Sequence, residues 1–266
     1  MRLSLVMPYY RNPRMFMWHL LNWRREWSAD MKQAVEIVIV DDGSPDETAA
    51  DAMRALRGDN GVAYDQMPKI SVYRVMEDRP WHQHGARNLG AHVAQAPFLL
   101  MTDMDHIVPV STLDEVLRRL PLHETEVLTF GRVDAPRTLT WRAAEWPEFA
   151  RTRREDGSLK PHVNSFVVSR ARYWQLGGYD EDFCGIYGTD KEFRTRLFGA
   201  GSTTSHLAHA PLIRVDREVI PDASTRDVQR KEGRDPLAKD RILLEKAKRG
   251  EAGVVKSLQF PWERVL

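Results

Sequence analysis

Two aspartates, Asp103 and Asp105, directly follow an apolar run at residues 98–102 and are separated by one residue. Carboxylate oxygens are ligands that Mg²⁺ and Mn²⁺ accept, and a turn can aim both acids at one such ion. A substrate that carries a diphosphate needs such a cation to neutralise its charge. A second Asp-x-Asp pair, Asp180 and Asp182, shows that the spacing alone is weak evidence, so the position after a predicted strand favours the first pair.

A second acidic turn, Asp41-Asp42-Gly43-Ser44, follows the apolar run at residues 36–40. Adjacent carboxylates at this place can accept hydrogen bonds from a nucleotide base or a ribose. The same residues also suit a plain turn before the next helix, with Ser44-Pro45-Asp46-Glu47 as a capping box. Both interpretations are compatible with the sequence.

The segment 79–91 mixes cations, an amide and glycines at a predicted helix start. Arg79 and Arg87 have the chemistry to hold phosphate, as do backbone amides at a helix N-terminus. The alternative for Arg87 is a position on a solvated helix face. His82 and His84 are expected at the surface, without a role in the chemistry.

Short apolar runs predict the strands that must carry these motifs. Four of them read as buried parallel strands, and residues 127–132 and 163–169 predict further strands. Apolar residues at helical spacing predict helices between them, including one that Ser111 caps and one at about 190–198. The alternation is typical of an α/β fold with a mostly parallel sheet flanked by helices, which binds ligands at the carboxyl ends of its strands. The four runs are residues 3–7, 36–40, 70–75 and 98–102.

The composition excludes several classes of protein. The 266 residues carry 39 Lys and Arg against 38 Asp and Glu, a net charge of +1 that creates no field favouring nucleic acid. With 42% hydrophobic residues the chain can bury a core, which excludes disorder as its main state. The single cysteine, Cys184, rules out an internal disulfide, and no apolar run is long enough for a secretory signal or a membrane span. We expect a cytoplasmic protein without a transmembrane segment, with any membrane contact peripheral.

Two stretches depart from the regular pattern. Residues 134–162 are charged and aperiodic, which predicts a long excursion. From residue 216 the chain turns basic and polar, with one helix expected to begin near Pro236. We expect this tail, residues 216–266, to act as a lid over a bound ligand, the alternatives being contact with an anionic membrane and plain packing on the domain. The cations expected to close the lid are Arg226, Arg230 and Lys231.

Together these motifs resemble, in order and spacing, those of a GT-A glycosyltransferase of the family 2 type. The resemblance covers residues 3–215 and includes the acidic turn at 40–44, Arg87-Asn88-x-Gly90 and the Asp103/Asp105 pair. Two later segments also match. Residues 177–183 resemble the family's Gly-Gly-x-Asp-Glu-x-Phe, and residues 185–193 align without gaps on its Gly-Trp-Gly-x-Glu-Asp-x-Glu-Phe.

The resemblance implies a Rossmann-like GT-A domain at residues 1–215, with a nucleotide-binding half (1–105) and an acceptor half (106–215). It implies a metal-dependent hexosyltransferase that moves a sugar, with inversion, from a nucleoside diphosphate sugar, expected to be UDP-linked, to a hydroxyl of a glycan, lipid-linked or other acceptor. One alternative is a sugar-phosphate nucleotidyltransferase, whose glycine-rich loop after the first strand is missing here. Another is a non-catalytic nucleotide-sugar-binding module on the same fold.

The resemblance also implies roles for individual residues. Asp190 falls on the position of the catalytic base, and Mn²⁺ or Mg²⁺ would be held by Asp103 and Asp105 with His206 or His209 as a third ligand. Asn164 either lines the donor pocket or is a plain strand-end asparagine. The residues implied to bind the nucleotide sugar are Pro8, Tyr10, Asp41, Asp42, Arg79, Arg87 and Asp103.

The chain departs from the family pattern just before Asp190. Thr189 replaces a Glu, and Ile186 and Tyr187 replace the Trp-Gly pair. The acceptor contacts that family members make there are therefore not carried over to this chain, and the identity of the acceptor stays open.

Overall fold

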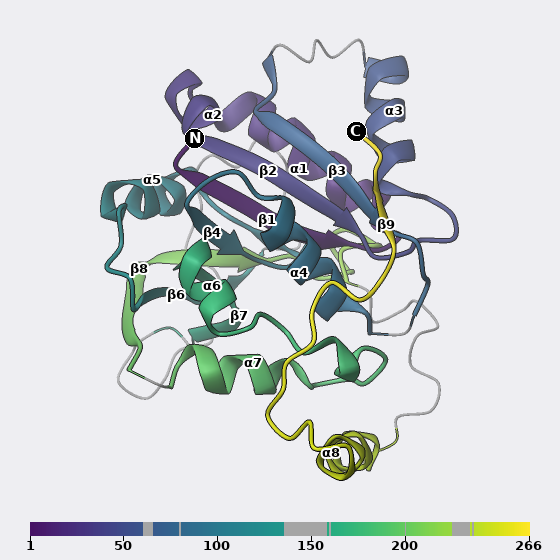
Figure 1. Cartoon of the computed structure of the whole chain (residues 1–266). Coiled ribbons are helices and arrows are strands. Elements are labelled where there is room, and N and C mark those ends of the chain that lie inside the picture. Colours follow the sequence, from purple (N-terminus) through teal and green to yellow (C-terminus); the bar gives the residue numbers. More distant parts are fainter. Residues whose placement is uncertain are drawn as a thin grey trace.

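The computed structural model describes residues 1–60, 66–79, 81–135, 159, 161–199, 201–224, 235 and 237–266. Within these residues the chain forms one sheet with the strand order β5-β8-β6-β7-β4-β1-β2-β3-β9, and helices cover both of its faces (Figure 1). This architecture confirms the predicted α/β fold class.

The centre of the sheet is parallel. β1 pairs with β2 on one side and with β4 on the other, and β3 continues the sheet beyond β2. All four strands predicted in the first half are present, and β1 and β2 are buried along their whole length. Their carboxyl ends meet at one edge of the sheet, where the acidic motifs follow them. The bounds are Leu3–Tyr9 for β1, Val35–Asp41 for β2, Lys69–Val75 for β3 and Phe98–Met101 for β4.

Helices cover both faces of this core because successive residues of a strand point to opposite faces. Leu5 and Met7 of β1 lie in one apolar cluster with α1 and α3, whereas Val6 lies in another with α4. Gly90 of α4 approaches the strand so closely that a Cβ atom there would lie 2.3 Å from Val6 Cγ1. Only glycine permits this approach, which seats Arg87 of the same helix at the strand ends. The bounds are Pro13–Glu26 for α1, Ala29–Ala34 for α2, Ala49–Asn60 for α3 and Gln83–Val93 for α4.

The turn after β2 differs from the expected capping box. Thr48 and Asp51 form the box: the Asp51 amide donates to Thr48 Oγ1 at 3.2 Å, and the Thr48 amide donates to the Asp51 carboxylate at 3.1 Å. Ser44 Oγ instead accepts a hydrogen bond from the Arg11 amide at 3.1 Å. The prediction of Ser44 as the cap was wrong because the chain bends between Ser44 and the start of α3.

The second half extends the sheet largely with antiparallel pairs. β7 runs antiparallel to β4, with Met101 opposite Phe166, so residues that follow β4 approach residues that precede Phe166. β6 pairs with β7 and β8, and β5 closes this edge of the sheet against β8. The predicted strands at 127–132 and 163–169 and both predicted helices are present, but the prediction that Ser111 caps the first of these helices was wrong, because that helix begins at Val110 after Pro109 and has no side-chain cap. The bounds are β5 His106–Ile107, α5 Val110–Arg119, β6 Glu126–Asp134, β7 Pro161–Ser169, α6 Arg170–Gln175, η2 Glu181–Phe183, α7 Asp190–Leu197 and β8 Thr203–Arg214.

The C-terminal segment returns to the first half of the chain. From α8 (Ala238–Lys248) it runs back along the molecule, and β9 (Trp262–Arg264) pairs antiparallel with β3 (Figure 1, yellow). The buried Lys246 ammonium lies 2.8 Å from the Asp180 carboxylate and 2.6 Å from that of Asp182. The described part of the tail is therefore anchored to both halves of the chain.

Two expectations fall outside the described residues. The cations Arg226, Arg230 and Lys231, expected to close a lid, belong to an undescribed stretch, and so does most of the excursion at 134–162. Across the part of the chain that is described, we find no helix with the length and apolar character needed to span a bilayer.

Candidate functional site

A cleft of about 910 Å³ opens where the carboxyl ends of β1, β2 and β4 meet the loops that precede α4 and α7. Its place agrees with the rule that α/β sheets bind ligands beyond the carboxyl ends of their strands. Six of the residues singled out in the sequence line it, together with Asn164. The six are Pro8, Tyr10, Asp42, Asp103, Asp105 and Asp190.

Asp41 is buried behind the cleft and holds the turn that presents Asp42. Its carboxylate accepts hydrogen bonds from the Ser44 amide at 2.8 Å and from the Ala49 amide at 2.9 Å. Burial raises the pKa of the Asp41 carboxyl above its usual value, and these hydrogen bonds oppose the rise. Asp41 therefore acts as part of a plain turn before the next helix. Asp42 faces the cleft, where it could contact a nucleotide.

Arg87 is 1% exposed and does not lie on the cleft wall. Its guanidinium donates to the Tyr179 hydroxyl at 2.7 Å and is paired with the Asp103 carboxylate. The expectation that it lies on a solvated helix face is wrong, and the structure does not bring it to the cleft as a phosphate ligand. Its position makes it the partner that orients Asp103.

Arg79 and the two histidines after it occupy different environments. Arg79 is half exposed, pairs with Glu77 at 2.7 Å and lies over the Phe260 ring at 4.7 Å. His82 is fully buried, with Nδ1 3.3 Å from Asp42 Oδ1. His84 is 6% exposed and lines the cleft. The expectation of surface histidines was wrong, because the C-terminal segment covers His82 with Phe260 and Tyr179 stacks against His84.

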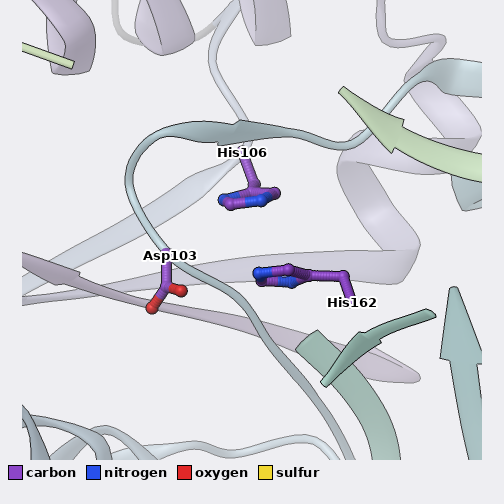
Figure 2. Close-up of side chains that lie close together, drawn as sticks. All are labelled: Asp103, His106 and His162. Atoms are coloured by element: carbon purple, nitrogen blue, oxygen red, sulfur yellow. The ribbon is translucent and has the colours of Figure 1, made fainter. Parts of the chain in front are cut away.

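Asp103, His106 and His162 bring their side chains together beside the cleft (Figure 2). One possible ligand atom from each lies within 4.8 Å of the others. The two imidazole rings stack with their centroids 4.0 Å apart, and both side chains are buried. A carboxylate with two imidazoles is a donor set that binds divalent transition ions.

The Nδ1 atom of each imidazole is already engaged. His106 Nδ1 lies 2.6 Å from Asp105 Oδ1, and His162 Nδ1 lies 2.9 Å from Ser165 Oγ. The Nε2 atom of His106 is buried and has no hydrogen-bond partner among the described residues. Burial and the neighbouring His106 lower the pKa of His162 to about 2, so its ring is neutral and keeps a free lone pair. The two Nε2 atoms and the Asp103 carboxylate therefore fit a divalent cation.

The two histidines expected as a third metal ligand lie elsewhere. His206 and His209 are exposed on β8. β8 places His206 opposite Thr129 of β6, and its Nδ1 lies 3.2 Å from Thr129 Oγ1. The structure does not bring either histidine to Asp103, because the neighbour of β4 in the sheet is β7.

Asp190 is the first residue of α7 and faces the cleft. Its Oδ2 atom lies 3.5 Å from the Arg194 guanidinium, one helical turn on, and Arg194 also donates to Asn164 Oδ1 at 3.2 Å. These contacts hold the Asp190 carboxylate at the start of the helix, where it faces the contents of the cleft. Asp190 can thus accept a proton from a group bound in the cleft.

The acidic residues just before Asp190 make ion pairs and hydrogen bonds within the fold. Asp180 and Asp182 are neutralised by Lys246, so the second Asp-x-Asp pair is an ion-pair site. The buried Glu181 carboxylate accepts hydrogen bonds from Asn88 Nδ2 at 2.8 Å and from the amides of Leu258 and Gln259 at 2.8 and 2.7 Å. These contacts join α4, η2 and the C-terminal segment.

Several residues that the structure places at or beside the cleft were not among the site residues predicted from the sequence. His106 directly follows Asp105, and His162 lies two residues before Asn164, so adjacency to the chosen residues was an available signal. Trp81 and Tyr187 line the cleft as a ring pair whose centroids lie 4.5 Å apart. No periodicity marks Trp81 or Tyr187, because both belong to loops.

The sequence profile of a family described as glycosyl transferase family 2 matches residues 4–175 of the chain. The chain belongs to glycosyl transferase family 2. It is similar to the validoxylamine A glucosyltransferases of Streptomyces hygroscopicus subsp. limoneus and subsp. jinggangensis, at 28% identity over 230 residues in both cases. The match covers 75% of this chain and 48% or 52% of theirs, so this family 2 chain spans about half the length of the curated relatives it matches.

Solved structures share the fold of this family 2 chain. Residues 1–349 of TarS from S. aureus, in complex with UDP-GlcNAc, match with a TM-score of 0.57 and 17% identity, over 82% of this chain and 59% of that one. Mannosyltransferase PcManGT from Pyrobaculum calidifontis, in complex with GDP-Man and Mn²⁺, matches with a TM-score of 0.54 and 18% identity, over 81% and 56%. The likenesses establish the GT-A fold.

Proposed function

We propose that the protein is a metal-dependent, inverting glycosyltransferase that moves a sugar from a UDP-sugar to a hydroxyl acceptor. The observation that carries the proposal is one cleft lined by both Asp103, a member of the candidate metal group, and Asp190. Membership of glycosyl transferase family 2 supports the same reaction class. The cytoplasmic location expected from the sequence stays a prediction.

The nucleotide end of the donor is assigned to the ends of β1 and β2. Pro8 and Tyr10 offer ring surfaces, and the carboxylate of Asp42 can accept hydrogen bonds from a base or ribose. TarS has been solved with UDP-GlcNAc and the curated relatives are glucosyltransferases, which supports a UDP-linked hexose. PcManGT has been solved with GDP-Man, so a GDP-linked sugar is the alternative donor to compare with the UDP-linked one.

The divalent cation is assigned to Asp103, His106 and His162, with Asp105 orienting His106 through its Nδ1 atom. When bound, the ion supplies positive charge that neutralises the departing diphosphate. Two imidazole nitrogens favour Mn²⁺ over Mg²⁺, which prefers oxygen ligands and keeps its waters. The Arg87 guanidinium fixes the Asp103 carboxylate in this arrangement.

The role of the base in the transfer step is assigned to Asp190. An acceptor hydroxyl attacks the anomeric carbon of the sugar, the new C–O bond forms on the face opposite the nucleotide, and the bond from that carbon to the diphosphate oxygen breaks. The bonding electrons leave with the nucleoside diphosphate. The acceptor proton passes to the Asp190 carboxylate, whose Oδ2 atom lies 3.5 Å from the Arg194 guanidinium. One displacement inverts the anomeric configuration.

A donor panel tests the proposal without knowledge of the acceptor. The purified protein is titrated with UDP- and GDP-sugars by calorimetry with Mn²⁺, with Mg²⁺ and with EDTA, and slow donor hydrolysis is followed by NMR. We expect one UDP-sugar to bind and hydrolyse only with metal, releasing the sugar with inverted configuration. Formation of a nucleotide sugar from UTP and a sugar phosphate, or donor binding without any turnover, would contradict the proposal.

A further inference from the structure

Two aromatic rings from separate loops pack together at the cleft. Trp81 belongs to the connection between β3 and α4, and Tyr187 belongs to the loop before α7. Both line the cleft, and their ring centroids lie 4.5 Å apart with the ring planes at 59°. Tyr187 is 50% exposed although its ring is large and largely apolar. The pair thus presents aromatic surface to the contents of the cleft.

The backbone of Trp81 is held in an unusual conformation. Its φ angle is +51°, in the left-handed region that bulky residues rarely adopt. Such strain persists only where the surrounding structure enforces it, and it collects at ligand-binding sites. A tryptophan kept there in preference to glycine or asparagine indicates that the indole ring has a use at the cleft.

Tyr187, one member of the aromatic pair, belongs to the same loop region as Asp190, the residue proposed to meet the acceptor. Tyr187 precedes Asp190 by three residues, and both side chains line the same cleft. Gly188 between them has a φ angle of +83° and open space around the position that a Cβ atom would occupy. A molecule that fills the cleft with a hydroxyl at Asp190 therefore has Tyr187 among the residues that surround it.

We infer that Trp81 and Tyr187 form an acceptor platform, and that the acceptor is a six-membered cyclic polyol, a sugar or a carbocyclic ring. This inference rests on the proposed function and names the substrate class of that site. Such a ring has a C–H face that packs on an aromatic surface, while its hydroxyls point outward at the rim. In this pose one hydroxyl reaches Asp190, and Asn164 and Arg194 offer partners to the others.

Binding measurements separate this inference from the proposed function. UDP with Mn²⁺ is first titrated into the protein by calorimetry. Methyl β-D-glucopyranoside and myo-inositol are then added to the UDP complex and followed by saturation-transfer NMR. We expect at least one of them to bind, with Trp81→Ala and Tyr187→Ala weakening that binding at least tenfold and Tyr187→Phe keeping it. All variants should bind UDP within about twofold of the wild-type protein.

Trp262→Ala is the matched control, since Trp262 is also an exposed tryptophan but packs on Tyr73 and His92 at the sheet edge. It should leave polyol binding unchanged. Failure of both polyols to bind while UDP binds overturns the inference and leaves the proposed function standing. A large loss of UDP affinity in Trp81→Ala with polyol binding intact also overturns it, because the indole would then hold the nucleotide base. Absence of UDP binding to the wild-type protein refutes the proposed function and the inference together.

Discussion

The Nδ1 atom of His106 lies 2.6 Å from the Oδ1 atom of Asp105, so the two acids of the Asp-x-Asp pair make different contacts. Asp103 faces the imidazoles of His106 and His162, whereas Asp105 holds the first of these imidazoles. Arg214 lies 3.9 Å from the other oxygen of Asp105 and fixes its orientation. A carboxylate behind a ligating histidine is a common arrangement at metal sites.

Replacement of the buried histidines tests this metal assignment. His162→Ala should weaken Mn²⁺ binding by about 100-fold, because it removes a ligand, and Asp105→Asn by about tenfold, because it only loosens His106. Mn²⁺ binding is measured by electron paramagnetic resonance, which needs no substrate. His206→Ala is the control and should bind Mn²⁺ as the wild-type protein does. If His206→Ala and His162→Ala weakened Mn²⁺ binding equally, the assignment would be contradicted and a ligand on β8 would be indicated.

Arg87 is predicted to act through Asp103 and not by touching the donor. Arg87→Met should lower the free energy of unfolding by about 3 kcal/mol, because it leaves the Asp103 carboxylate without its buried partner. It should also weaken Mn²⁺ binding. Metal-free UDP affinity, measured by calorimetry, should change little. A large loss of metal-free UDP affinity would instead show that the guanidinium contacts the nucleotide.

The close contact of α4 with β1 predicts a specific double-mutant result. A Cβ atom on Gly90 would lie 2.3 Å from Val6 Cγ1, so Gly90→Ala should destabilise the protein by about 2 kcal/mol through overpacking. Val6→Ala in the same chain should recover part of that loss, because it removes the clashing methyl group. Chemical denaturation of the four proteins gives the coupling. Additive losses would argue that the helix can shift away from the strand.

Lys246 is predicted to stabilise the fold over a defined pH range. Burial would lower the pKa of Lys246, but Asp180 and Asp182 outweigh burial and raise it. Burial would likewise raise the pKa of Asp182, but Lys246 outweighs burial and lowers it. The raised Lys246 pKa gives stability that is complete below about pH 10 and is lost as the pH rises through that raised value. The lowered Asp182 pKa gives stability present above about pH 4 and lost as the pH falls through that lowered value.

Lys246→Met should therefore lower the free energy of unfolding by about 3 kcal/mol between about pH 5 and pH 10, with a smaller difference outside this range. Urea denaturation across pH measures it. Lys248→Met, which removes an exposed cation from the same helix, is the control and should change stability little. A difference that does not vary with pH would show that Lys246 acts through packing alone.

The sequence predicted the parallel core and several cleft residues because both depend on local pattern. An apolar run followed by acids identifies a strand end, and strand ends of a parallel sheet meet at one edge. The metal group could not be predicted in the same way. It depends on the antiparallel pairing of β7 with β4, which brings His162 to His106 across 56 residues of chain. Adjacency marks His106 beside Asp105 and His162 near Asn164, but no local pattern shows that β7 is the strand next to β4.

Buried charged residues are the second place where the structure differs from the sequence predictions. Arg87 was expected to hold phosphate or to lie on a solvated helix face, and Lys246 belongs to the tail described as basic and polar, yet both are almost fully buried. Their partners, Asp103 and the Asp180/Asp182 pair, come from distant segments that fold against them. Helical spacing indicates which face of a helix is apolar, but it does not reveal a charge that a distant carboxylate neutralises.

The most direct test of the account is the variant Asp190→Asn. This change keeps the size of the side chain and removes its ability to take a proton, so only the transfer step should suffer. With the donor that binds best in the presence of Mn²⁺, donor affinity by calorimetry should stay within about twofold of the wild-type value. Transfer to the acceptor should fall by about 10²- to 10⁴-fold. Transfer at the wild-type rate would contradict the assignment of Asp190 as the base.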